Sequence, residues 1–361
     1  YNIPQVSGVT ISIDLVNRLK KEFSDTITGI KDSSGNFENT KKYKEIKNYA
    51  INELNAPGSV MKLASVMALI DEGYCDENTL IDLENGEHKY YDVTLKDDHK
   101  VSGSVTLAKA LEISSNVGIS KPVYKHFHKN KEDFYEKLEQ FHLTKPYGLG
   151  IKGESAPILS PVKEWSGTSL PTIAFGQGYS LTAMQSTSVF ATIANDGVRV
   201  SPSILAGVVD ESGKYTPAKE NESVRVLSSQ TASNMRAMME SVVSSNGTAP
   251  AAAISGYRIA GKTGTANRFN TACKCYSGYT ASFIGFAPAD QPKYVISVTI
   301  QDPKGMHWGG ALAGPVFKKV MSFVLQNERI KPTPTADTFL SLTEAALKSP
   351  KQSTKKSEPK L

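Results

Sequence analysis

The residue that stands out for its chemistry is a lysine in an otherwise apolar stretch. Residues 59–70 read Ser-Val-Met-Lys-Leu-Ala-Ser-Val-Met-Ala-Leu-Ile, and Lys62 is the only charge among them. A helix that is apolar nearly all round is expected to be buried, and burial disfavours the charged form of a lysine. Ser59 precedes Lys62 by three residues, so one helical turn brings both side chains to the same face. A serine beside a neutral amine at a helix N-terminus is suited to nucleophilic catalysis.

The spacing of this serine and lysine is a weak signal when taken alone. Ser-x-x-Lys also occurs at Ser160–Lys163 in a loop-like stretch and at Ser353–Lys356 near the C-terminus. Only the pair at Ser59 follows a turn, Asn55-Ala-Pro-Gly58, and begins a predicted helix. Two interpretations stay open at this point: an activated nucleophile, or a lysine that extends from an ordinary core helix towards solvent.

A second group of polar residues lies where two helical stretches meet. Ser114-Ser115-Asn116 follows a predicted helix over residues 106–113 and precedes Gly118. A hydroxyl and an amide at such a break can face a cleft, relay a proton and hold a substrate carbonyl. Ser-x-Asn also occurs at Ser34 and Ser244 in turn-like loops, and alone it more often caps a helix.

The third group lies in a β-rich run near the end of the chain. Residues 261–266 read Gly-Lys-Thr-Gly-Thr-Ala, and Lys-Thr-Gly occurs only here. Glycines inside a strand mark the close approach of a ligand or another backbone. Lysine and threonine beside such a gap can bind a carboxylate, although the segment alone also fits a bulged strand with a solvated lysine.

The elements that must position these groups follow from the hydrophobic pattern, with helices in the middle and strands near the end. The late β-rich runs are separated by short turns, which is typical of an antiparallel meander. With an early strand over residues 9–15, they predict an α+β protein with an antiparallel sheet flanked by helices. The expected helices are 59–72, 106–113, 180–195, 228–243 and 313–325, and the expected late strands are 257–265, 279–287 and 294–301.

Composition excludes several classes of function. The 361 residues carry a net charge of +5, but residues 348–361 alone hold five lysines and one glutamate. The body is therefore nearly neutral, and no basic face for nucleic acid is expected.

No apolar run approaches the roughly 18 residues of a membrane span. Cys273 and Cys275 are too few ligands for a metal site, so exposed thiols are expected there.

The three motifs occur in one order, Ser-x-x-Lys, Ser-x-Asn and Lys-Thr-Gly, which is the order of the signature set of penicillin-binding proteins and class A β-lactamases. The chain resembles the transpeptidase domain of class B penicillin-binding proteins, most closely the cell-division type, FtsI. The similarity extends from Asn55 to Leu325. The further matching segments are Phe175–Gln185, Ile193–Gly197, Asn246–Ala249, Phe283–Pro288, Trp308–Gly310 and Gly314–Phe317.

The resemblance implies a fold and a role for each motif. The fold is the one that penicillin-binding proteins share with serine β-lactamases, in which a mainly helical subdomain lies beside the sheet. By similarity, Ser59 would attack the penultimate D-Ala carbonyl of a peptidoglycan stem peptide, and Lys62 would take its proton. Ser114 would relay a proton and Asn116 would hold the acyl amide. The residues that would bind the substrate are Lys262, Thr263, Gly264 and Thr265.

The same resemblance implies a cellular setting. β-Lactams would acylate Ser59 as substrate mimics, and neither a metal nor an organic cofactor is implied. The catalytic domain would lie on the periplasmic side of the bacterial inner membrane and act in septal wall synthesis, with a divisome glycosyltransferase as a protein partner. The chain opens at Tyr1 without a signal-like segment, so any membrane anchor is expected outside it.

Three parts are expected along the chain. Residues 1–54 form a strand and helix remnant, residues 55–328 form the transpeptidase domain, and residues 329–361 form a Pro/Thr/Lys-rich linker or tail. Residues 26–43 are short and polar where the family has a fuller strand pair. That hairpin is therefore expected to be truncated or incomplete.

Three other functions fit part of the pattern. A serine β-lactamase shares the fold and the acylation step, but the Glu-x-x-Leu-Asn-type loop of class A enzymes is absent between Asn116 and Gly178. Class D enzymes usually carry Ser-x-Val where this chain has Ser-x-Asn. A β-lactam sensor domain would be acylated without turning over. A catalytically silent scaffold is disfavoured by the complete set of motifs.

Overall fold

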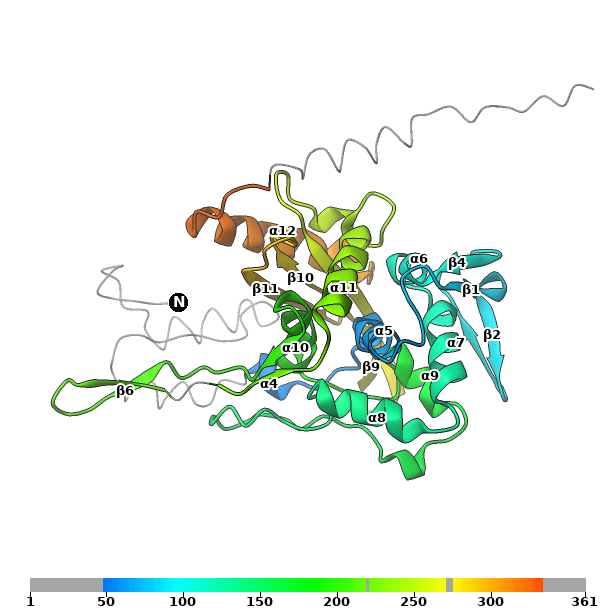
Figure 1. The fold of residues 1–361 in the computed structure, drawn as a ribbon, viewed down its shortest axis with the longest axis horizontal. Coiled ribbons are helices and arrows are strands. Elements are labelled where there is room, and N and C mark those ends of the chain that lie inside the picture. The colour runs from blue at the N-terminus through cyan, green and yellow to red at the C-terminus, as the bar shows by residue number, and fades with distance from the viewer. Residues whose placement is uncertain (1–47, 219–220, 271–274, 334–361) are drawn as a thin grey trace, which may run out of the picture.

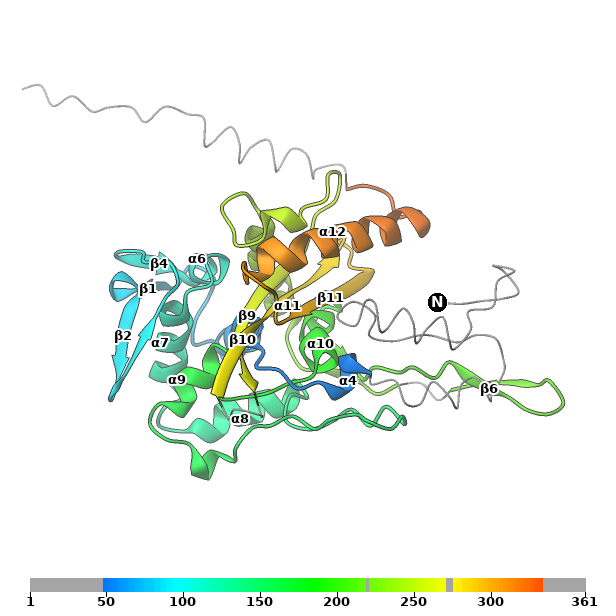
Figure 2. The ribbon, with the colours of Figure 1, turned by 180° about the vertical axis from the view of Figure 1, so that it is seen from behind.

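The computed structural model describes residues 48–218, 221–270 and 275–333. Within these residues the central sheet has three antiparallel strands in the order β11-β10-β9 (Figures 1 and 2). They are β9 (Ala260–Asn270), β10 (Cys275–Ala287) and β11 (Tyr294–Gln301). The predicted meander is confirmed, whereas the early strand expected over residues 9–15 lies outside the described residues.

One face of the sheet is covered by the long helix α12 (Gly309–Asn327), as Figure 2 shows. Phe317 of α12 packs against Phe283 of β10, with the ring centroids 4.8 Å apart. Both side chains are fully buried, in an apolar cluster that also includes η4 (Pro250–Ala252). This packing holds α12 across the strands and places its first turn beside β9.

The opposite face packs against the helices that carry the apolar segment around Lys62. That segment forms a short 3-10 helix, η1 (Gly58–Val60), followed by α5 (Lys62–Asp71). Every side chain from Leu63 to Leu69 is fully buried. The prediction of a buried central helix is therefore confirmed. Helices α10 (Ala183–Ala194) and α11 (Ser229–Val243) complete this layer.

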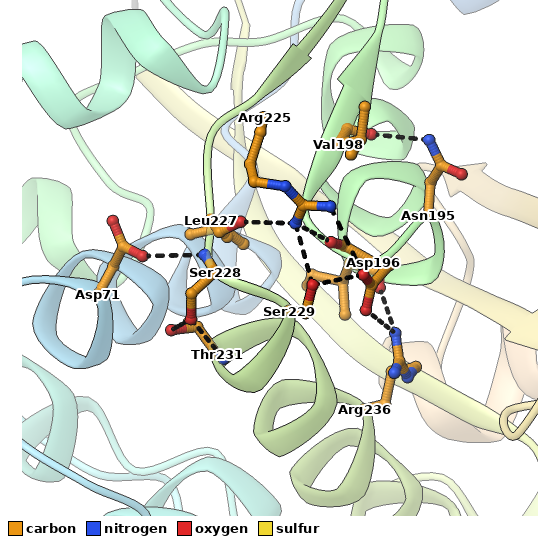
Figure 3. Close-up of polar contacts among 11 residues, drawn as sticks. Asp71, Asn195, Asp196, Val198, Arg225, Leu227, Ser228, Ser229, Thr231 and Arg236 are labelled. Atoms are coloured by element: carbon orange, nitrogen blue, oxygen red, sulfur yellow. Dashed lines mark hydrogen bonds and ion pairs between the residues drawn. The ribbon is translucent and has the colours of Figure 1, made fainter.

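Asp196 ties α10 to α11 at one end of the layer (Figure 3). Its carboxylate accepts a hydrogen bond from the Ser229 hydroxyl (2.6 Å) and pairs with Arg236 (3.7 Å). Close by, the backbone N–H of Ser228 donates to the carboxylate of Asp71 at the end of α5 (3.3 Å). The three helices are thus joined by polar contacts at the surface as well as by their apolar faces.

A mainly helical subdomain lies beside the sheet, as the resemblance implied (Figure 1). Helix α6 confirms the helix predicted over residues 106–113. The helical stretch that the sequence indicated after Ser114-Ser115-Asn116 is α7, although it contains Pro122. The sequence pattern did not indicate α8, where only Phe134 and Leu138 are buried. The elements of the subdomain are α6 (Leu107–Glu112), α7 (Asn116–Phe127), α8 (Lys131–Gln140), α9 (Ser169–Ala174), β1 (Leu80–Asp82), β2 (Glu87–Tyr90), β3 (Val93–Lys96) and β4 (Ser104–Thr106).

The remaining described elements are short. The antiparallel pair β6–β7 extends away from the body of the molecule (Figure 1). The full set of these short elements is α4 (Tyr49–Asn52), η2 (Glu84–Gly86), η3 (Val162–Glu164), β5 (Val198–Val200), β6 (Gly207–Val209), β7 (Tyr215–Pro217) and β8 (Ser223–Arg225).

The cysteines differ from the expectation. Cys275, at the start of β10, is disulfide-bonded, so the prediction of exposed thiols is wrong at this position. Cys75 is free and buried. The sequence reasoning weighed only metal ligation and free thiols, because three cysteines in so long a chain do not indicate a disulfide framework.

The three-part organisation of the chain stays a prediction. Residues 1–47 and 334–361 lie outside the described residues, and so does the hairpin expected over residues 26–43. Among the helices that are described, none combines the length and apolar character needed to cross a membrane.

Candidate active site

Two glycines set the position of Ser59. Gly58 has a left-handed backbone (φ 54°), and its N–H donates to the carbonyl oxygen of Gly176 (3.0 Å). Gly176 is also left-handed (φ 92°), and a Cβ there would lie 2.0 Å from the Gly58 carbonyl oxygen. Because only glycine allows this approach, the segment around Gly176 acts as a backbone support for η1. The Ser59 side chain is half-buried and lies one turn before Lys62.

Replacing Gly176 with alanine is expected to destabilise the protein by more than about 3 kcal/mol. The new Cβ would collide with the backbone of Gly58, which cannot move without displacing Ser59. Thermal unfolding measures the effect. Gly153→Ala is the matched control, since Gly153 has a similar φ of 94° but its nearest neighbour to a Cβ is Asn52 at 3.9 Å. Equal losses in the two variants would contradict the supporting role of Gly176.

Lys62 is fully buried and reaches the second motif. Its Nζ donates to the Ser114 carbonyl oxygen (2.5 Å) and to the Ser114 hydroxyl (3.1 Å). Burial lowers the pKa of Lys62 to about 7, while the carboxylates of Asp97 and Asp98 raise it by less. A substantial fraction of the amine is therefore neutral near pH 7 and can accept a proton.

Lys262 approaches the same hydroxyl from the sheet. Its side chain is fully buried, and its Nζ lies 2.9 Å from the Ser114 hydroxyl and 3.2 Å from that of Thr263. Burial lowers the pKa of Lys262 well below its ordinary value, and the charge of Lys62 lowers it further. The Ser114 hydroxyl thus lies between two buried amines. It can donate its proton to one amine while it accepts a hydrogen bond from the other.

The start of α7 presents the other members of the second motif. The Ser115 hydroxyl caps the helix by accepting from the N–H of Gly118 (2.7 Å). Asn116 is the first residue of α7, and its Nδ2 donates to the carbonyl oxygen of Lys96 (2.8 Å). This contact fixes the amide and leaves its oxygen as the acceptor for a ligand N–H.

The third motif runs along β9, which is an edge strand of the sheet within the described residues. A Cβ at Gly264 would lie 3.3 Å from the Pro57 carbonyl oxygen and 2.3 Å from the Ser282 hydroxyl, so this glycine allows η1 to approach the strand. The hydroxyls of Thr263 and Thr248 are 3.0 Å apart. On the same strand, the Thr265 hydroxyl accepts from the N–H at the start of α12 (3.2 Å).

Comparison with known proteins decides the family. The model of the penicillin-binding protein transpeptidase domain matches residues 29–322. The chain belongs to this family.

PbpB of Mycolicibacterium smegmatis is 35% identical to this chain over 311 residues, which is 83% of this chain and 47% of PbpB. The peptidoglycan D,D-transpeptidase FtsI of Escherichia coli is 34% identical over 288 residues, 80% of this chain and 46% of FtsI. The chain therefore spans about half the length of the curated relatives it matches.

Solved structures give the same assignment. The crystal structure of penicillin-binding protein 3 from Mycobacterium tuberculosis has a TM-score of 0.74 and 32% identity, covering 82% of this chain and 69% of that one. The same protein has been crystallised with aztreonam and with ampicillin. These similarities confirm the predicted α+β fold of the penicillin-binding proteins.

The structure brings most of the predicted site residues into one place. Lys62, Ser114 and Lys262 are in direct contact, and Thr263 joins them through its hydroxyl. Asn116 lies two residues further along the same turn, at the start of α7. The remaining predicted residues, which flank this cluster on η1 and β9, are Ser59, Gly264 and Thr265.

Sequence reasoning did not predict the contacts of three residues that hold these groups. Gly176 lies in a segment that matched the family, but the match did not reveal its contact with Gly58. A Cβ at Gly309 would lie 2.4 Å from the Gly264 carbonyl oxygen, so α12 begins in close contact with β9. No feature of the sequence singled out Asp97, because its hydrogen-bond partners lie about twenty residues further along the chain.

Proposed function

We propose that this chain is the catalytic domain of a peptidoglycan D,D-transpeptidase that cross-links stem peptides through an acyl-enzyme on Ser59 and is acylated by β-lactams. The observation that carries the proposal is the Ser114 hydroxyl, which lies 3.1 Å from the Lys62 amine and 2.9 Å from the Lys262 amine. A buried proton path beside a serine on a helix N-terminus is suited to acyl transfer.

In the first half-reaction, the Ser59 oxygen forms a bond to the penultimate D-Ala carbonyl carbon and its proton passes to neutral Lys62. The tetrahedral intermediate then collapses, the peptide bond to the terminal D-Ala breaks, and the leaving nitrogen takes a proton. Ser114 supplies that proton and recovers one from Lys62. The products are free D-Ala and an ester on Ser59.

The binding groups are assigned from the resemblance to the family. The backbone N–H groups of Ser59 and Thr265 form the oxyanion hole, a role that requires donors fixed before the reaction. Lys262, Thr263 and Thr265 hold the terminal carboxylate. The donor peptide lies along the β9 edge as an added strand, and the side-chain oxygen of Asn116 accepts from its amide N–H.

In the second half-reaction, the amine of a neighbouring stem peptide attacks the ester carbonyl. Its nitrogen forms the cross-link, the bond to the Ser59 oxygen breaks, and the amine proton returns to that oxygen through Lys62. The net reaction exchanges one amide bond for another, so neither an oxidant nor an added energy source is required.

Acylation is expected to speed up as the pH rises through about 7, because Lys62 accepts the Ser59 proton only in its neutral form and its pKa is lowered to about 7 by burial. Below that pH the amine is protonated and each unit of pH costs about tenfold in rate. Stopped-flow acylation by a chromogenic cephalosporin between pH 5 and 9 measures the profile. A rate that stays flat from pH 5 to 8 would exclude Lys62 as the base.

The proposed transpeptidase is tested with a synthetic donor peptide ending in D-Ala-D-Ala and a small amine acceptor. The expected result is release of D-Ala with formation of the donor–acceptor amide, and no product with a Ser59→Ala variant. Acylation by penicillin without any release of D-Ala would instead identify a β-lactam sensor, and the absence of both reactions would identify a silent scaffold.

We further propose the cellular setting of the FtsI-type relatives for this domain. It would act on the periplasmic side of the bacterial inner membrane, and it would work with a divisome glycosyltransferase in septal wall synthesis. Support comes from the identity of 34% to FtsI of Escherichia coli over 80% of this chain.

A further inference from the structure

A single carboxylate, that of Asp97, binds the turn that carries the second motif. Asp97 follows β3, and its Oδ1 accepts from the backbone N–H groups of Asn116 (2.5 Å) and Val117 (2.9 Å). Its Oδ2 accepts from the Ser115 hydroxyl (2.6 Å). Three donors from three consecutive residues thus converge on one side chain. A carboxylate at this position also interacts favourably with the N-terminus of α7.

The carboxylate is itself held in place by the β2–β3 hairpin. The backbone N–H of Asp97 donates to the carbonyl oxygen of Gly86 (2.8 Å). Gly86 has a left-handed backbone (φ 79°), and a Cβ there would lie 3.4 Å from the Asp97 Cβ. Asp97 therefore has a fixed position of its own and can act as a clamp for its partners.

The turn that Asp97 clamps has a strained backbone. Ser114 is one of the non-glycine residues with a positive φ (60°), a conformation that costs of the order of 1 kcal/mol or more. Such a residue keeps its conformation only where its surroundings hold it. The strained residue is the one whose hydroxyl lies between the amines of Lys62 and Lys262.

Asp97 also contributes charge to the same place. Lys62 faces two carboxylates, Asp97 and Asp98, and both favour the protonated amine. The neighbouring amine is that of Lys262 on β9. Its pKa is lowered by burial and further by the charge of Lys62. Asp98 is exposed, and the hydrogen bonds to the α7 turn are made by Asp97. The two aspartates thus share an electrostatic effect but differ in their contacts.

We propose that Asp97 is a positioning residue for acyl transfer: its carboxylate holds the turn from Ser114 to Val117 so that the Ser114 hydroxyl stays between the two buried lysines. The proposal rests on the serine acyl-transfer function proposed above. It adds a residue outside the three motifs, which touches neither the substrate nor the reacting atoms and acts through the residues that do.

The test measures the second-order rate of acylation by a fluorescent penicillin from pH 5 to 9 in three variants. Asp97→Asn removes both the charge and an acceptor oxygen. The constant rate that acylation reaches at high pH, the plateau, is expected to fall about 10- to 100-fold. The acid limb, which is the part of the profile where the rate rises with pH, is expected to move to lower pH. Asp98→Asn, the matched control, is expected to move the acid limb in the same direction and keep the wild-type plateau. Asp97→Glu keeps the charge but displaces the oxygens, so it is expected to lower the plateau and leave the acid limb in place.

A wild-type plateau in Asp97→Asn would overturn the proposal, and so would equal losses of plateau in Asp97→Asn and Asp98→Asn. If Asp97→Asn does not fold, as thermal unfolding would reveal, Ser115→Ala replaces it, since this change removes one of the three donors, together with the hydrogen bond from the N–H of Gly118, and leaves the charge. Ser115→Ala is expected to lower the plateau, and an unchanged plateau would count against the proposal. Failure of the wild-type protein to be acylated at all would instead refute the proposed function.

Discussion

Changing Ser59 to alanine is expected to abolish covalent labelling by a fluorescent penicillin, with a loss of at least about 10⁴-fold in acylation rate. The alanine has no oxygen to form the ester, and no neighbouring group replaces that oxygen as the nucleophile in the proposed mechanism. Labelling on a denaturing gel measures the effect, because the adduct survives unfolding. Thermal unfolding of the variant is expected to match the wild type, since Ser59 is half-buried and its removal leaves the backbone of η1 unchanged.

Ser160→Ala is the matched control for this change. Ser160 also lies three residues before a lysine, Lys163, but in an exposed stretch that leads into η3. Its hydroxyl is expected to be dispensable, so the variant should label at the wild-type rate. Labelling of Ser59→Ala, or loss of labelling in Ser160→Ala, would show that the nucleophile has been assigned to the wrong serine.

The second large effect is expected for Lys62→Met, which should lower the acylation rate by about 10²- to 10⁴-fold, the usual contribution of a general base. Methionine keeps most of the volume of the buried side chain but cannot take the Ser59 proton. The free energy of unfolding is expected to change by less than about 2 kcal/mol, because the lost hydrogen bonds to Ser114 are offset by removal of a buried polar amine. Stopped-flow acylation and thermal unfolding measure the two quantities.

The pH profile of Lys62→Met provides an internal check. Its residual acylation is expected to lose the acid limb near pH 7 that the wild type shows, since the titrating amine is gone. Lys163→Met, in the exposed second Ser-x-x-Lys, is expected to keep both the rate and the profile. A Lys62→Met variant that retains the wild-type rate would mean that another group takes the proton from Ser59.

The sequence was sufficient to identify the groups to which we assign the chemistry. Lys62 was conspicuous because a lone charge in an apolar helix requires a specific reason to be there, and its full burial confirms that reasoning. The late strands were predicted equally well, because alternation and short turns are local signals. The contact between Lys62, Ser114 and Lys262 joins three distant segments and could be expected only through the resemblance to a family.

What the sequence could not predict is the set of residues that hold this machinery in place. Gly176 matters through a backbone contact with Gly58, and Asp97 through hydrogen bonds to a turn about twenty residues away. Neither contact leaves a periodic or local pattern, since it depends on how whole elements pack. Helix α8 was missed for a related reason: few of its side chains are buried, so it carries little hydrophobic periodicity.

The most direct test of the proposed acyl-enzyme is an intact-mass time course after mixing with a penicillin, followed by mapping of the modified peptide. We expect one adduct with the full mass of the drug, bound through an ester on Ser59 and stable for hours, because a transpeptidase waits for an amine and has no efficient base for water. Rapid return of the free protein with hydrolysed drug would instead identify a β-lactamase. An adduct on any other residue, or none at all, would contradict the assignment of Ser59.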